Sequence, residues 1–282
     1  MKNPKRKMQI CGLSIILAGA ALLSACNSAG AKTSDASNQS AAQRDVIYQV
    51  SLLQGLTYGD YNGSVPVSRL KEMGDTGIGT FNGLNGELIM LDGTVYRAAH
   101  DGSIEVVADE ETIPFANVTF FDKDTEAQLT DIDSVVSLKE ALDKKVQETG
   151  TNHFYMVKVE GVFRTMDVRS ELPQTEPYQP LAKVLETDQT FFNYQDVKGT
   201  VVGLYCPNYM SELNAVGWHF HFISDDREMG GHVLDLSADT LYISMDRTDG
   251  FSMKLPDNEM FNSFDLSVDQ SSDIKKVETG EE

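Results

Sequence analysis

The stretch Trp218-His-Phe-His-Phe-Ile-Ser-Asp-Asp-Arg-Glu-Met-Gly-Gly-His232 holds three of the five histidines of this chain. His219 and His221 alternate with aromatic residues, which is the period of a β-strand, so we expect the two imidazoles to share one face. Gly230-Gly231 supplies turn residues just before His232 and a second apolar run. The sequence therefore predicts a hairpin that brings all three imidazoles to one point.

Three imidazoles from two paired strands match the ligand set of a metal site. One histidine on a strand is usually structural and two leave the choice open, but a third from the partner strand favours a metal. A cupin would need a glutamate a few residues after the second histidine, and Glu228 lies too far along, in the predicted loop. Nitrogen ligands suit zinc, and iron, nickel or copper are compatible with them.

The N-terminus combines a basic start with an apolar run, Cys11 to Leu23, that is too short to span a membrane comfortably. This pattern predicts a secretory signal peptide at residues 1–25. The sequence Leu-Ser-Ala-Cys26 resembles a bacterial lipobox, which implies lipid on the Cys26 thiol; a plain signal peptide cleaved nearby is the alternative. Residues 26–43 read as the lipidated cysteine and a flexible linker. We expect an exported protein, held on the extracellular face of the membrane only by its lipid.

The formal net charge is −20, and loss of residues 1–25, which hold four basic and no acidic residues, makes it −24. Such a charge disfavours binding to nucleic acid and to anionic lipid headgroups. An anionic substrate would therefore need local positive charge at its site. With Cys11 removed and Cys26 lipidated, Cys206 has no cysteine partner, and its apolar surroundings in the sequence predict a buried structural thiol.

Strand patterns and hairpin turns dominate residues 44–282, with helices set apart, which predicts an α+β fold of mixed and antiparallel sheets with a few peripheral helices. We expect two lobes that divide near 175–195 and, by composition, a disordered tail from Ser267 to Glu282. The predicted helices cover 45–56, 67–73, a segment opened by Ser137-x-x-Glu140 and closed at Gly150, 181–188 and 258–264. The predicted strands cover 87–91, 94–98, 103–107, 154–160, 162–169, 200–206, 218–223, 232–236, 240–245 and 252–255.

The Trp-His-Phe-His-Phe stretch and the Gly-Gly-His-Val-Leu-Asp turn resemble the zinc-site signature of the alpha-acetolactate decarboxylase family. Short matches occur in the same order across the chain: Gly79-Thr80-Phe81, Gly86-Glu87-Leu88, Leu91-Asp92-Gly93-Thr94, Glu160-Gly161, Val168-Arg169 and, more loosely, Val277-Glu278. The resemblance implies Zn²⁺ as cofactor and a small 2-hydroxy-3-oxo acid as substrate. The implied reaction converts 2-hydroxy-2-methyl-3-oxobutanoate (2-acetolactate) to acetoin and carbon dioxide. A homodimer is also implied.

The resemblance also assigns site residues. Glu87 shares a strand face with apolar neighbours, where a buried carboxylate needs a partner; the alternative is an exposed strand end, and the resemblance implies an active-site glutamate. Arg169 is implied to bind the substrate carboxylate through its guanidinium fork, in preference to Arg164 on the other side of the strand. Thr80 is expected to line the pocket. Glu278 is implied to reach the metal.

Two other functions remain open on the sequence. One is a lipid-anchored metal-binding or solute-binding protein that has the fold without turnover. The other is zinc-dependent hydrolysis, for which Glu87 would serve as the general base. Identification of the product made by the purified protein distinguishes the three.

Overall fold

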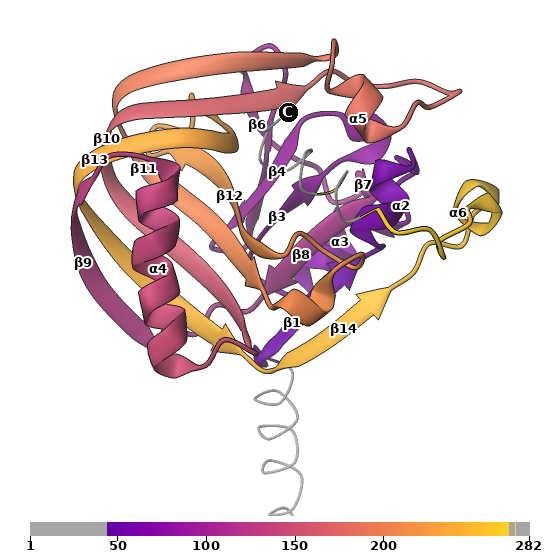
Figure 1. Cartoon of the computed structure of the whole chain (residues 1–282). Helices are drawn as coiled ribbons and strands as arrows, with labels where there is room; N and C mark the ends of the chain where they lie inside the picture. Colours follow the sequence, from indigo (N-terminus) through magenta and orange to yellow (C-terminus); the bar gives the residue numbers. More distant parts are fainter. Residues whose placement is uncertain (1–43, 271–273, 275–282) are drawn as a thin grey trace, which may run out of the picture. The chain divides into compact units, whose positions relative to one another are not determined.

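A computed structural model of the chain describes residues 44–270 and Ile274 (Figure 1). The predicted signal peptide, the linker with Cys26, and Glu278 lie outside the described residues. A seven-stranded sheet has the order β14-β1-β8-β3-β4-β5-β6, and a five-stranded sheet has the order β10-β11-β12-β13-β9. Few helices accompany them, so the predicted α+β class is confirmed. No helix among residues 44–270 is long and apolar enough to cross a membrane.

The two sheets take their strands from different parts of the chain. The seven-stranded sheet consists of β1 (Val46–Val50), β3 (Thr76–Thr80), β4 (Glu87–Leu91), β5 (Thr94–Ala98), β6 (Ile104–Val106), β8 (Phe115–Thr119) and β14 (Gly250–Lys254). The five-stranded sheet consists of β9 (Thr125–Ile132), β10 (Phe154–Glu171), β11 (Gln189–Cys206), β12 (Gly217–Ser224) and β13 (Gly230–Thr248). β2 (Val65–Pro66) and β7 (Thr112–Ile113) form a separate pair. The helices are α2 (Leu53–Thr57), α3 (Val67–Lys71), α4 (Val135–Thr149), α5 (Leu181–Val184) and α6 (Glu259–Ser263), with 3-10 turns η1 (Asn82–Leu84) and η2 (Asn208–Met210).

The hydrophobic core is layered because the two sheets pack on each other and helices cover parts of their outer faces. One face of the seven-stranded sheet packs on α3, through Leu88 and Leu70 among others. Its other face packs on the five-stranded sheet, where Ile89 meets Met156 and Ile223 in one buried cluster that also contains Cys206. The far side of the five-stranded sheet is covered by α4 (Figure 1). The free, buried Cys206 confirms the predicted structural thiol.

Several predicted elements were wrong in extent or type. Residues 45–56 form β1 and then α2, because β1 lies between β8 and β14 with both faces covered, and its apolar residues therefore imitate helical spacing. The expected break at Gly161 is absent from the continuous strand β10; a Cβ there would lie 2.9 Å from the carbonyl oxygen of Thr240, so this glycine permits close strand packing. The predicted strands at 232–236 and 240–245 are likewise one strand, β13.

Helix α4 begins earlier than predicted. Ser134 is its N-cap, and Ser134 and Ser137 together form the capping box, so Ser137 occupies the third helical position rather than the cap. The end of the helix at Gly150 is confirmed. The range 175–195 covers part of the connection between β10 and β11 and the start of β11; these two strands are neighbours in one sheet, whereas the chain passes between sheets from β8 to β9. The division into two lobes stays a prediction.

Candidate active site

The β12–β13 hairpin places the three histidines where the sequence predicted. His221 on β12 pairs directly with His232 on β13, and Arg169 on β10 pairs with the same His232 from the other side. His219 lies two residues before His221 on the same face. Its Nε2 atom is 3.1 Å from Nε2 of His221 and 3.1 Å from Nδ1 of His232. The register of β10, β12 and β13 therefore places the three imidazoles and the guanidinium of Arg169 next to one another.

The ring of His221 is oriented by the other sheet. Its Nδ1 atom donates a hydrogen bond to the backbone carbonyl of Leu88 on β4, at 2.9 Å. Because a carbonyl can only accept, Nδ1 carries the proton and the lone pair of Nε2 is turned toward the other two histidines. Asp225 and Asp226 lie in the exposed turn between β12 and β13, where Asp225 pairs with Lys198 and Asp226 accepts a hydrogen bond from Ser224.

Burial favours the neutral form of two of these imidazoles, those of His221 and His219. It lowers the pKa of His221 to about 4; the Leu88 hydrogen bond opposes this shift, and the charge of Arg169 adds to it. Burial also holds the pKa of His219 well below its usual value, with contributions from His221 and Arg169. A neutral imidazole is the form that binds a metal.

The spacing of the imidazole nitrogens also fits a metal ion. Bonds of 2.0–2.1 Å to a tetrahedral ion would put the ligand nitrogens about 3.3 Å apart, close to the 3.1 Å separations in the structure. Among the described residues, His219, His221 and His232 form the cluster of potential ligands that could hold a metal ion.

Glu87 and Thr80 enter the same cavity from the seven-stranded sheet, where they pair directly across β3 and β4. Glu87 is 5% exposed, and its Oε2 lies 3.3 Å from Nε2 of His221. The alternative of an exposed strand end therefore does not apply. The hydroxyl of Thr80 donates to the carbonyl of Gly86 at 2.8 Å, which fixes the side chain in the wall of the cavity.

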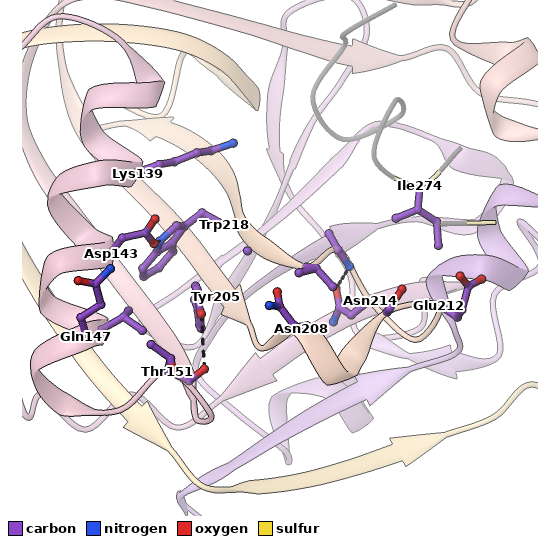
Figure 2. A pocket seen from close by; sticks show the side chains of 15 residues that line it. Lys139, Asp143, Gln147, Thr151, Tyr205, Asn208, Glu212, Asn214, Trp218 and Ile274 are labelled. Carbon is purple, nitrogen blue, oxygen red and sulfur yellow. Dashed lines mark hydrogen bonds between the residues drawn. The ribbon is translucent and has the colours of Figure 1, made fainter. Parts of the chain in front are cut away.

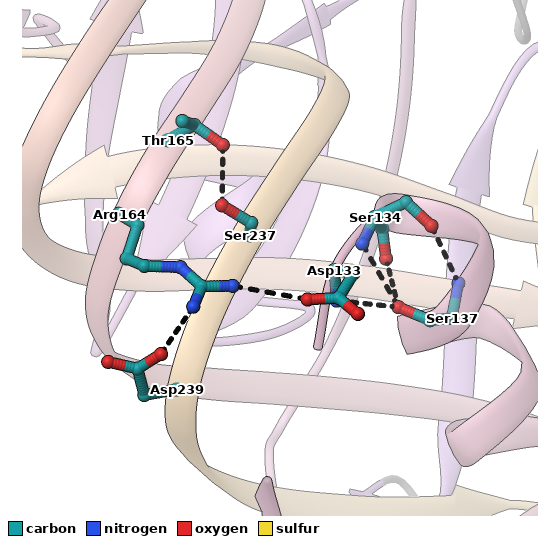
Figure 3. Close-up of polar contacts among 7 residues, drawn as sticks. All are labelled: Asp133, Ser134, Ser137, Arg164, Thr165, Ser237 and Asp239. Atoms are coloured by element: carbon teal, nitrogen blue, oxygen red, sulfur yellow. Dashed lines mark hydrogen bonds and ion pairs between the residues drawn. The ribbon is translucent and has the colours of Figure 1, made fainter. Parts of the chain in front are cut away.

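The two arginines of β10 have different surroundings. Arg169 is 5% exposed and lines the cavity with the histidines. Arg164 lies at the surface, where it forms ion pairs with Asp133 and Asp239 (Figure 3). The structure thus places in the cavity the arginine that the resemblance favoured.

Glu171 is a cavity residue that the sequence analysis missed. It is buried, and its Oε1 lies 3.6 Å from Nε of Arg169. The predicted strand ended at Arg169, whereas β10 continues to Glu171. A period of two from Arg169 places Glu171 on the same face, so continuing the strand by two residues would have found it.

A larger cavity, of about 660 Å³, lies between α4 and the segment 205–218 (Figure 2). Trp218 is on its wall and donates to Asp143 at 2.8 Å. Because Trp218 and His219 are adjacent on β12, their side chains leave opposite faces of the strand. The three imidazoles do not line this larger cavity. They line the smaller one, together with Arg169, Glu87 and Glu171.

Comparisons with known proteins agree with this geometry. The family model described as alpha-acetolactate decarboxylase matches residues 47–268. The alpha-acetolactate decarboxylase of Methanosarcina mazei is 41% identical over 234 residues, which cover 83% of this chain and 80% of that protein. The corresponding protein of Bacillus subtilis is 34% identical over 237 residues, covering 83% of this chain and 90% of the relative.

Solved structures match the fold over the same region. The crystal structure of alpha-acetolactate decarboxylase from Bacillus subtilis superposes with a TM-score of 0.79 and 32% identity, covering 83% of this chain and 99% of that one. A Staphylococcus aureus protein of unknown function, described as similar to alpha-acetolactate decarboxylase, gives a TM-score of 0.78 and 30% identity, with 83% and 100% covered. With the family model and these relatives spanning most of its length, the chain belongs to the alpha-acetolactate decarboxylase family of carboxy-lyases.

Proposed function

We propose that the protein decarboxylates 2-acetolactate to acetoin and carbon dioxide, with zinc held by His219, His221 and His232. One observation carries this proposal: three imidazoles, of which those of His221 and His232 are buried, converge beside Arg169 and Glu87 in a single cavity. The names of the relatives support the substrate, and the all-nitrogen ligand set supports zinc. We further propose that Glu278, outside the described residues, is an additional ligand.

The charges in the cavity argue for a divalent cation. The described residues that line it and carry a formal charge are Arg169, Glu87 and Glu171. With both carboxylates ionised these sum to one negative charge, which would repel an anionic substrate. The two positive charges of a zinc ion at the imidazoles would change this sum from −1 to +1, or to zero with the carboxylate of Glu278, and either sum removes the repulsion. When bound, zinc supplies a Lewis acid that stabilises the electron pair left by the departing carbon dioxide.

The protein's own groups perform the remaining tasks. Arg169 holds the substrate carboxylate through its planar fork, which aligns the bond that breaks. Apolar side chains of α2 and α5, including Leu53 and Leu181, line the cavity and limit access of water. After carbon dioxide leaves, a proton must be added to the adjacent carbon. Glu87 is positioned to donate it if it first takes up a proton, and a water molecule near Arg169 is the alternative source.

The test is product analysis of the purified protein with racemic 2-acetolactate, combined with metal analysis of the same sample. We expect acetoin and carbon dioxide in equal amounts, loss of activity with a chelator, and recovery with zinc.

His221→Ala should lose bound zinc and reduce activity by more than about 100-fold, since even a residue that only hydrogen-bonds to a metal ligand contributes 10–100-fold to metal affinity or activity. His153→Ala, in the turn before β10, is the control. A metal-loaded protein that forms no product would indicate a binding protein, and a hydrolysis product would indicate the third function.

We also propose that the protein is an exported lipoprotein and a homodimer. The lipobox-like sequence before Cys26 supports the anchor. Cys26→Ser should move the protein from the membrane fraction to the medium or block its processing, and normal processing with membrane retention would contradict the proposal.

Light scattering of the chain without residues 1–25 tests the dimer. A measured mass equal to that of a monomer would contradict it.

A further inference from the structure

We propose that Glu171 is a specificity residue: one carboxylate oxygen holds Arg169, and the other accepts a hydrogen bond from the 2-hydroxyl group of the substrate. This inference deepens the proposed function and rests on it, because it takes the substrate to be a 2-hydroxy-3-oxo acid. It assigns recognition of the hydroxyl to a group that lies outside the three-histidine cluster.

The position of Glu171 follows from strand geometry. Glu171 is two residues after Arg169 on β10, so both side chains leave the same face and enter the same cavity. The side chains of both residues are only 6% exposed. A carboxylate removed from water to this extent is costly unless its oxygens find partners.

The two oxygens of Glu171 have different surroundings. Oε1 lies 3.6 Å from Nε of Arg169, an ion-pair contact that orients the side of the guanidinium next to Nε. Oε2 is buried and has no hydrogen-bond partner among the described residues. The neighbouring Tyr61 does not supply one, because its hydroxyl donates to the carbonyl of Gln179 at 2.8 Å. The charge of Glu171 instead contributes, after burial, to raising the pKa of Tyr61.

A buried acceptor without a donor is rare in folded proteins and indicates a missing partner. The partner must donate a hydrogen bond and must lie close to a carboxylate that is bound to Arg169. A 2-hydroxy-3-oxo acid has one such donor, the hydroxyl on the carbon next to its carboxylate. When Arg169 binds that carboxylate, the hydroxyl is one carbon away from it, and Glu171 is the carboxylate that contacts the same guanidinium.

This arrangement predicts discrimination by the hydroxyl group. A site built to bind a hydroxyl rejects the analogue without it, because a buried polar group is then left unpaired. A 3-oxo acid without the 2-hydroxyl would place a hydrogen or a methyl group against Oε2. It would bind less well although its carboxylate and ketone are unchanged.

The test uses binding of two acids that cannot react: 2-hydroxy-2-methylbutanoate and 2-methylbutanoate, which differ only in the hydroxyl. Calorimetry on the zinc-loaded protein measures the ratio of their dissociation constants, from which the contribution of Arg169 to the shared carboxylate cancels. We expect the wild type to prefer the hydroxy acid. Glu171→Leu should reduce that preference at least about tenfold, the size of one lost hydrogen bond to a charged group.

Two further variants make the result decisive. Glu171→Gln keeps the size and one oxygen acceptor, so it should fold if the leucine variant does not, and should retain part of the preference. Glu160→Leu removes an exposed glutamate from the same strand and should leave the ratio unchanged. Zinc content is measured in every sample, because hydroxy acids also chelate metals.

The outcomes separate this inference from the proposed function. An unchanged ratio in Glu171→Leu at equal zinc content, or no preference in the wild type, overturns the role of Glu171. A wild type that prefers the hydroxy acid, loses the preference with Glu171→Leu, and yet makes no acetoin refutes the decarboxylase proposal while Glu171 remains a hydroxyl-recognising residue.

Discussion

Arg169 and Arg164 carry the same charge on the same strand, and their surroundings assign them different tasks. Arg169 is buried next to Glu171 and the imidazoles, whereas Arg164 bridges Asp133 and Asp239 at the surface. A surface ion pair contributes little, because water screens it. A buried guanidinium that faces a substrate carboxylate depends on its planar, two-pronged shape.

Arg169→Lys should therefore lower kcat/KM on the order of 100-fold, the cost of misplacing a reacting group by about 1 Å. The charge is kept and the fork is lost, so zinc content should stay near that of the wild type. Arg164→Lys is the matched control and should stay within about twofold, as expected for an exposed pair. Steady-state kinetics with 2-acetolactate measures both, and a larger effect from Arg164→Lys would mean that the wrong arginine faces the substrate.

At the scale of elements, the site depends on one hairpin and one neighbouring strand. Gly231 adopts a φ of 150° in β13 and lies directly before His232. A Cβ on Gly231 would lie 2.7 Å from the carbonyl oxygen of Arg169 on β10. This close approach is what places His232 opposite Arg169, and a glycine is required for it.

Gly231→Ala should push β13 away from β10 and move His232. We expect zinc affinity and activity to fall at least about tenfold, with a loss of unfolding free energy of roughly 1–3 kcal/mol for the overpacked strand pair. Gly93→Ala is the control, because Gly93 also has a positive φ but has open space around it. Zinc titration and chemical unfolding of both variants measure the effects; equal zinc affinity in the two would argue against a role for this contact.

The elements that the sequence predicted well are those specified by local signals. The β4–β5 hairpin follows from Asp92-Gly93, and the β12–β13 hairpin follows from the alternation around His219 and His221. Gly230 and Gly231, which we expected in its turn, are instead paired with β12 inside β13, and the turn lies at 225–229. β1 was mistaken for a helix because its pattern reflects burial on both faces, which depends on distant strands. The three histidines could be found because the alternation around them is a local signal. Glu171 was missed because nothing local marks the true end of β10.

At the scale of the whole molecule, one buried carboxyl stands out against the large negative charge of the chain. Asp246 on β13 is 1% exposed, and burial raises its pKa to about 7. Asp124, Asp122 and Asp45 add to the shift through their negative charge, while the backbone N–H of Asp122 opposes it. The folded protein therefore holds a proton on Asp246 that the unfolded chain releases near pH 4.

Stability should consequently depend on pH through Asp246. Its raised pKa stabilises the fold below pH 4, and that contribution is lost as the pH rises from about 4 to 7, up to roughly 4 kcal/mol in total. Asp246→Asn cannot lose a proton, so above pH 7 it should be more stable than the wild type. Urea unfolding at pH 5 and pH 8 gives the difference, with the exposed Asp249→Asn as control. A variant that gains nothing at pH 8 would show that Asp246 is ionised in the fold without cost.

The hydrogen bond from His221 to the carbonyl of Leu88 affects whether activity or secondary structure is lost first on heating. His221 belongs to the five-stranded sheet, whereas Leu88 and Glu87 belong to the seven-stranded sheet. Each sheet keeps its own backbone hydrogen bonds if the two move apart, but the site then loses both its orienting carbonyl and its glutamate. Catalytic activity should therefore depend on contact between the two sheets. Inactivation and zinc release should precede the loss of β-sheet circular dichroism as the temperature rises, and simultaneous transitions would mean that the sheets separate only when they unfold.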